Sequence, residues 1–204
     1  MLGMRFFQLR IKKRNFINYL YNQVYKDIFL SYEQLTSFED LVSKGKYNCL
    51  TGSIFFALLL ERYDFEYRVI ETNYHMFILI EDEGKEYLLE STDPIHGFET
   101  NPFVIAKRMA EYKAKNSEAA KNSIPFRFDL FNNVALSQLE GLLAYNNSVL
   151  AFNQREFFLA IDHLYDASLS YTSPRIIEMA KIIEVCLDEL PADNIYLEKL
   201  AKIK

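Results

Sequence analysis

The chain has 204 residues, half of them hydrophobic and a quarter charged, which is enough to bury a sizeable core and excludes a disordered or fibrous protein. With 23 basic against 28 acidic residues the formal net charge is -5, so composition gives no support to nucleic-acid binding. One basic run, at residues 10–14, lies among apolar residues. We interpret it as the solvated start of a helix, with a phosphate or lipid contact as the alternative.

The cysteines and the apolar stretches indicate the cellular compartment in which the protein is expected. Cys49 and Cys186 lie far apart in dissimilar settings, which favours a reducing compartment over a disulfide framework. The longest apolar stretch, at residues 54–60, is too short to span a bilayer, and the N-terminal residues lack a signal-peptide pattern. We therefore expect a cytoplasmic protein with no membrane span, unless an export signal lies upstream of this sequence.

Helical periodicity begins close to the N-terminus. Apolar and aromatic side chains recur at helical spacing over about residues 12–31. A short second helix is expected from Ser37, whose hydroxyl can cap the amides of Glu39 and Asp40. Residues 49–63 are apolar on nearly every side, which predicts a central buried helix.

The pattern then changes to a period of two. Alternation and turn residues predict strands near residues 67–69, at 76–80 and at 86–90, with a hairpin turn at 82–85. Residues 101–122 return to a helical pattern. Helices followed by a small antiparallel sheet predict an α+β domain, which we place at residues 1–130.

The C-terminal region, residues 131–204, is expected to be an all-α extension. The window at 141–174 has about the length of one tetratricopeptide repeat and resembles that repeat in its small residues, Ser148, Ala160 and Ala167. One such unit cannot bury its apolar face alone. We therefore expect the extension to dock on the core or to bind a partner protein.

Cys49 is the residue that could carry chemistry. It opens the buried helix, where the helix dipole and the nearby Lys44 and Lys46 favour thiolate over thiol. A thiolate can attack a carbonyl carbon if a base takes its proton, and His75 on a strand is the candidate base. The imidazole in turn needs an acceptor, for which Asp93 is the candidate. The alternative is a buried structural cysteine, a half-buried histidine and an aspartate that caps a turn.

This hypothesis requires a particular register between the strands that carry His75 and Asp93. Residues directly opposite across an antiparallel pair share a face. His75 falls opposite Asp93 if Asp82 pairs with Glu86, whereas a connection with an even number of residues places Thr92 opposite His75. We therefore predict an odd-length connection or a bulge.

Three segments resemble the core of the transglutaminase-like superfamily: Tyr-Asn-Cys-Leu-Thr-Gly-Ser at 47–53, Tyr-His-Met-Phe-Ile at 74–78, and Leu-Glu-Ser-Thr-Asp-Pro at 89–94. The resemblance is close over residues 30–98. It extends more loosely toward residue 175, because a repeat-like tail follows this core in some bacterial members. It implies a papain-like fold in which a central buried helix packs on a small antiparallel sheet.

The resemblance also implies roles: Cys49 as the nucleophile, His75 as the general base and acid, and Asp93 as the orienting carboxylate. The chain has no Trp, whereas eukaryotic cross-linking members use an indole to stabilise the oxyanion. The substitutes would be the Cys49 amide and the Gln34 side chain. Calcium-binding segments and flanking β-domains are also absent, which favours a small bacterial thiol hydrolase or acyltransferase over a cross-linking enzyme.

Three further residues, Asn48, Tyr74 and His96, are expected to line the pocket. His96 could also join Cys49 and His75 in a metal site, but the closely spaced ligand pairs typical of zinc sites are missing. We therefore expect neither a metal nor a cofactor.

The resulting hypothesis is a protease, amidase or acyltransferase that acts on the amide carbonyl of a peptide or protein. The alternative is a catalytically inactive papain-like core that serves as a protein-interaction scaffold together with its helical tail. A sulfur of Cys49 sealed from solvent would favour the scaffold. A groove on the tail lined by Tyr145, Asn146 and Asn147 would also favour the scaffold.

Overall fold

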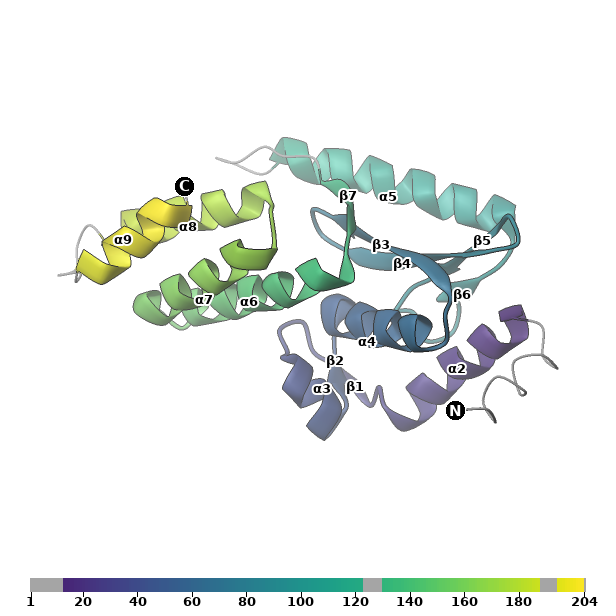
Figure 1. The fold of residues 1–204 in the computed structure, drawn as a ribbon. Coiled ribbons are helices and arrows are strands. Elements are labelled where there is room, and N and C mark those ends of the chain that lie inside the picture. Colours follow the sequence, from purple (N-terminus) through teal and green to yellow (C-terminus); the bar gives the residue numbers. More distant parts are fainter. Residues whose placement is uncertain (1–12, 123–129, 188–193, 204) are drawn as a thin grey trace.

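The computed structural model describes residues 13–122, 130–187 and 194–203, and within them the protein has the predicted α+β architecture (Figure 1). The helices are α2 (Lys13–Asp27), α3 (Phe38–Lys44), α4 (Cys49–Arg62), α5 (Pro102–Asn122), α6 (Leu136–Asn153), α7 (Phe157–Ser170), α8 (Pro174–Leu187) and α9 (Asn194–Ile203). The strands are β1 (Ser31–Tyr32), β2 (Lys46–Tyr47), β3 (Glu66–Thr72), β4 (Met76–Asp82), β5 (Lys85–Leu89), β6 (Phe98–Glu99) and β7 (Phe131–Val134).

Five of these strands form one antiparallel sheet in the order β6-β5-β4-β3-β7. In Figure 1 the helix α5 covers one face of this sheet and α4 covers the other. Because side chains alternate along a strand, β4 contributes Phe77 and Leu79 to the α5 side and Ile78 and Ile80 to the α4 side. A strand buried on both faces explains the unbroken apolar run in this part of the sequence.

The helix α4 is the central buried helix that the apolar pattern predicts. A capping box between Asn48 and Thr51 starts it, and it contacts β3, β4 and α6. Its first turn lies very close to the sheet: a Cβ added at Gly52 would be 2.9 Å from the Cβ of Ser91. Only glycine fits this close approach, which fixes the start of α4 against the end of β5.

The predicted short helix is also confirmed. Ser37 caps α3 by accepting the backbone N–H of Asp40, and Gly45 ends the helix with a φ of 69°. The predicted basic run is described only from Lys13 and Arg14, which begin α2, while residues 10–12 lie outside the described residues.

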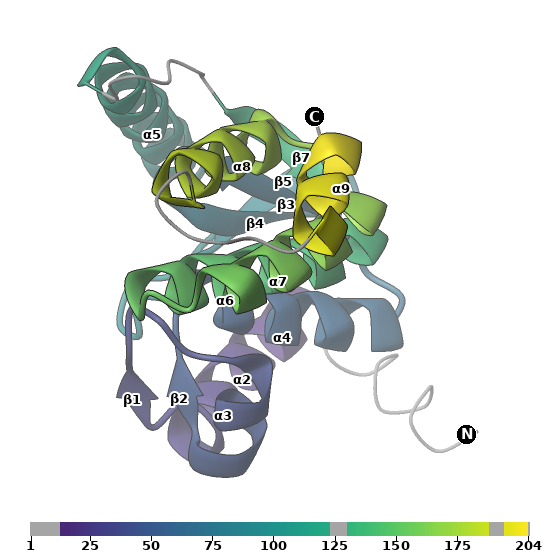
Figure 2. The same cartoon turned by 90° about the vertical axis from the view of Figure 1, so that its left-hand side faces the viewer.

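The extension contains α6 to α9, and α6 packs against α4 (Figure 2). Ser148 on α6 donates a 2.7 Å hydrogen bond to the carbonyl of Ala160 on α7, and neither residue has exposed surface. The strand β7 pairs with β3, so the sheet continues four residues past the predicted domain boundary at 130.

None of the helices in the described segments combines the length and the apolar composition that a bilayer crossing requires.

Candidate active site

The side chains of Cys49, His75 and Glu90 meet at the N-terminal end of α4. Cys49 is the first residue of the helix, is half-buried, and lies close enough to His75 to raise the pKa of its imidazole. His75 directly precedes β4, and its Nε2 lies 2.6 Å from Oε2 of Glu90. With Nε2 engaged by the carboxylate, Nδ1 is the ring nitrogen that remains for the sulfur.

The prediction of an odd-length connection or a bulge between β4 and β5 is wrong. Asp82 pairs with Lys85, so the turn contains only Glu83 and Gly84, whose φ angles are 52° and 75°. Such left-handed pairs form the two-residue turn that matches the twist of a hairpin. Extending this register places Thr92 opposite His75 and turns Asp93 away from the imidazole.

Asp93 has other partners. Its Oδ1 accepts the backbone N–H of His96 at 2.9 Å, and its Oδ2 lies 3.4 Å from Nη2 of Arg108. It therefore caps the loop after β5 and pairs with α5. The expected contact between Asp93 and His75 is corrected to one between Glu90 and His75, because the even register puts Glu90 on the face that carries the imidazole.

Glu90 is held firmly in this position. It is 4% exposed, and besides His75 it accepts hydrogen bonds from the hydroxyl of Tyr112 at 2.9 Å and from that of Thr92 at 3.0 Å. Burial, and then the charge of Glu90, raise the pKa of Tyr112, so its hydroxyl stays a donor. A buried carboxylate needs such partners, because an unpaired charge in the interior is costly.

Burial by itself lowers the pKa of His75, but hydrogen bonds and charges act in the opposite direction. The contacts with Cys49 and Glu90 outweigh burial and raise the pKa of His75 to about 9. The ring is therefore predisposed to hold a proton at neutral pH. An imidazolium beside a sulfur is the arrangement that favours a thiolate.

Asn48 fixes the position of Cys49. Its Oδ1 accepts the backbone N–H of Thr51 at 2.9 Å, and its Nδ2 donates to the carbonyl of Gln34 at 3.1 Å. Asn48 is 2% exposed, so its side chain belongs to the helix cap rather than to a pocket lining. The same contact brings the backbone of Gln34 next to the start of α4, while Gln34 itself is exposed.

Two tyrosines flank the site. Tyr74 is 43% exposed, and its ring is stacked with that of His75 at a centroid distance of 6.1 Å. Tyr32 pairs with Tyr47 across β1 and β2, and burial followed by the charge of Cys49 raises its pKa, which places it near the sulfur. His96, which was expected to line the pocket, is exposed on the loop after Asp93.

Sequence reasoning missed Glu90, Tyr112 and Tyr32. The signal for Glu90 was available, because the pair Glu83-Gly84 is a typical two-residue hairpin turn and fixes the even register. Tyr112 has no comparable signal, since only the packing of α5 on the sheet brings it to the carboxylate.

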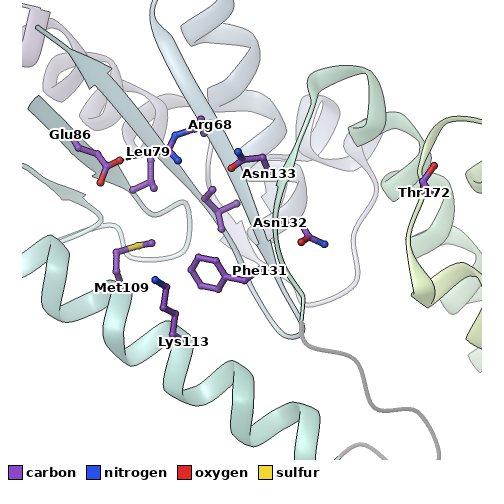
Figure 3. A pocket seen from close by; sticks show the side chains of 10 residues that line it. Arg68, Leu79, Glu86, Met109, Lys113, Phe131, Asn132, Asn133 and Thr172 are labelled. Carbon is purple, nitrogen blue, oxygen red and sulfur yellow. Dashed lines mark hydrogen bonds and ion pairs between the residues drawn. The ribbon is translucent and has the colours of Figure 1, made fainter. Parts of the chain in front are cut away.

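A separate groove of about 730 Å³ lies on the α5 side of the sheet (Figure 3). Lys113, Phe131 and an ion pair of 2.6 Å between Arg68 and Glu86 line it, and no residue of the Cys49 site does. Over the segments that the structure describes, no group of three or more His, Cys, Asp and Glu side chains could hold a metal ion.

Comparison with protein-family models, with curated proteins and with solved structures gives no match for the chain. The transglutaminase-like resemblance therefore stays a prediction.

Proposed function

We propose that the protein is a thiol enzyme that acts on amide or peptide carbonyls through Cys49, His75 and Glu90. One observation carries the proposal: Nε2 of His75 lies 2.6 Å from the buried Glu90 carboxylate, and Cys49 acts on the same imidazole to raise its pKa. A nucleophile at the start of a buried helix, with the base just before one strand and the carboxylate just after the next, also supports a papain-like, transglutaminase-like core. Glu90 takes the place that the resemblance gave to Asp93.

The first half-reaction forms an acyl-enzyme. With the thiol proton of Cys49 already held on His75, the thiolate sulfur attacks the carbonyl carbon to give a tetrahedral oxyanion. The Cys49 amide is one of the first amides of α4, which have no acceptor within the helix, so it can donate to that oxyanion. The Gln34 side chain is the proposed second donor, because the hydrogen bond from Asn48 holds its backbone beside the helix start.

The intermediate then collapses. His75 gives its proton to the leaving nitrogen, the carbon–nitrogen bond breaks, and a thioester remains on Cys49. Water or an amine then loses a proton to His75 and attacks the thioester carbon. The carbon–sulfur bond breaks and the acyl product leaves, so Cys49 is regenerated with the proton held on His75. Hydrolysis, deamidation and amine transfer share the first step and differ in this second nucleophile. Throughout, Glu90 orients the ring and stabilises the imidazolium.

Two observations favour the enzyme over the inactive scaffold. Cys49 is half-buried rather than fully buried, so the residue that carries the proposed nucleophile reaches the surface. Tyr145, expected to line a partner-binding groove on the tail, is partly buried, and burial raises the pKa of its hydroxyl while the nearby Arg175 acts in the opposite direction.

The proposed substrate is the amide group of a peptide or protein, and the helical extension is the proposed contact for a protein partner. The chemistry requires no cofactor. A reducing, cytoplasmic environment would keep the thiol of Cys49 available.

The direct test is to trap the acyl-enzyme with a peptide 4-nitrophenyl ester. We expect a burst of one nitrophenol per protein and a matching mass increase on Cys49 in intact and digested protein. Cys49→Ala should abolish both, whereas Cys186→Ala, which removes the other cysteine, should retain both. A burst that survives Cys49→Ala, or wild-type protein that forms no adduct, would contradict the proposal.

A further inference from the structure

Arg175, near the start of α8, reaches from the helical extension to the end of β3. Its Nη2 donates a 2.6 Å hydrogen bond to the carbonyl of Thr72, and its Nε lies 3.2 Å from Oε1 of Glu71. In Figure 1 the start of α8 lies beside the end of β3. The planar guanidinium thus binds two consecutive residues of the strand, a geometry that lysine cannot reproduce.

Thr72 in turn holds the backbone of His75. The Thr72 N–H donates to the His75 carbonyl at 2.8 Å, and the Thr72 hydroxyl donates to the same carbonyl at 3.0 Å. The His75 N–H donates to that hydroxyl at 2.9 Å. The turn that presents the imidazole is therefore closed by the residue whose carbonyl Arg175 binds, and Thr72 has no exposed surface.

The neighbouring Glu71 anchors Arg175. Glu71 is 4% exposed and accepts a 2.5 Å hydrogen bond from the hydroxyl of Tyr171, which also belongs to the extension. Burial raises the pKa of Glu71, while Arg175 and Tyr171 act in the opposite direction. The extension thus supplies both groups that bind this buried carboxylate.

The position of Arg175 in its own helix also points to this contact. A cation in the first turn of a helix opposes the helix dipole, so local preference disfavours arginine there. The contacts with Glu71 and Thr72 offset that cost. The residue is explained by the tertiary contact and not by the stability of α8.

We propose that Arg175 is a positioning residue, which acts through Thr72 to set where the His75 imidazole lies relative to Cys49 and Glu90. The helical extension then helps to position an active-site residue, in addition to packing against the core. The assignment of a catalytic purpose rests on the proposed function, whereas the mechanical coupling between α8 and His75 can be measured independently of it.

The experiment compares Arg175→Met with the wild-type full-length chain by two readouts. The first is the pKa of His75, from the NMR titration of its ring. The second is the rate at which iodoacetamide alkylates Cys49 as a function of pH, in a Cys186→Ala background. We expect the His75 pKa to fall from about 9 toward the usual value for histidine, and the alkylation rate at pH 6 to fall about 10- to 100-fold.

Lys199→Met is the matched control. Lys199 on α9 forms a 2.5 Å ion pair with Asp162 on α7, so its loss perturbs the extension without touching the turn at Thr72. It should leave both readouts at wild-type values. Arg175→Lys keeps the charge beside Glu71 but cannot bind Glu71 and Thr72 together, so its His75 pKa and its alkylation rate should lie between those of the wild type and Arg175→Met. If Arg175→Met does not fold, Arg175→Lys serves as the test variant.

A folded Arg175 variant with the wild-type His75 pKa and alkylation profile would overturn the coupling. An equal loss in Lys199→Met would also overturn it, because the effect would then follow general destabilisation. If wild-type protein forms no acyl-enzyme but Arg175→Met still shifts the His75 pKa, the proposed function fails and the coupling stands.

Discussion

The Nε2 atom of His75 lies 2.6 Å from Oε2 of Glu90, although Asp93 is the carboxylate that the family resemblance puts forward. The cause is the even number of residues in one turn. Because two residues connect β4 and β5, Glu90 shares a face of the sheet with His75 and Asp93 does not. Asp93 is left to cap the loop at His96. The orientation of the proposed base therefore depends on Glu90.

Substituting the two carboxylates separately tests this difference. Glu90→Gln keeps the shape of the side chain but removes the charge that stabilises the imidazolium, and should slow acyl-enzyme formation by about 100-fold or more. Asp93→Asn should change the rate by no more than about threefold, because Asp93 does not touch the ring. Burst kinetics with the nitrophenyl ester measure both variants. The reverse order of effects would restore Asp93 as the orienting carboxylate.

The pH dependence of His75 follows from the same contacts. Both Cys49 and Glu90 favour the protonated ring, so its pKa should be near 9 in the wild type, and Glu90→Gln or Cys49→Ala should lower it. The imidazole should thus remain charged through neutral pH and lose its proton only as the pH approaches 9. NMR titration of the ring carbons gives the midpoint directly. A wild-type midpoint at the ordinary value of about 6.5 would be inconsistent with the geometry.

Gln34 can be tested by separating two kinds of reaction at the same sulfur. Alkylation by iodoacetamide forms no oxyanion, whereas attack on an ester or amide carbonyl does. Gln34→Ala should therefore reduce acyl-enzyme formation by about 100-fold while leaving alkylation at the wild-type rate. If both rates fall together, Gln34 supports the fold of the site rather than the oxyanion. If neither changes, another group is the second donor.

Packing in the extension gives a prediction about stability. Leu164 on α7 has no exposed surface, while Leu169 on the same helix is 70% exposed. Leu164→Ala should lower the free energy of unfolding by about 2–5 kcal/mol, because it leaves a cavity. Leu169→Ala should change it by less than about 0.5 kcal/mol. Urea denaturation followed by circular dichroism measures both, and equal losses would be incompatible with the observed packing of α7.

Several elements could be predicted because their signals are local. An apolar pattern on all sides predicts the buried α4, and the hydroxyl of Ser37 predicts the start of α3. Ser148 and Ala160 are two of the small residues by which the window at 141–174 resembles a tetratricopeptide repeat, and they join α6 to α7. In each case the determining residues lie within a few turns of one another.

The site could be predicted only in part. Cys49 and His75 were identified by their residue types and by the elements that carry them, and the structure brings them together. Tyr112 and Arg175 were missed because their contacts, with Glu90 and Thr72, join residues 22 and 103 positions apart. Such contacts depend on how α5 and α8 pack against the sheet, which local periodicity does not encode.

The central claim is that His75 and Glu90 activate the sulfur of Cys49, and its most direct measurement is the alkylation rate of Cys49 at pH 6 in the Cys186→Ala background. We predict that iodoacetamide modifies Cys49 at least about tenfold faster than it modifies a free cysteine peptide, and that His75→Ala removes the excess. A rate equal to that of the peptide, or one that His75→Ala leaves unchanged, would contradict the account.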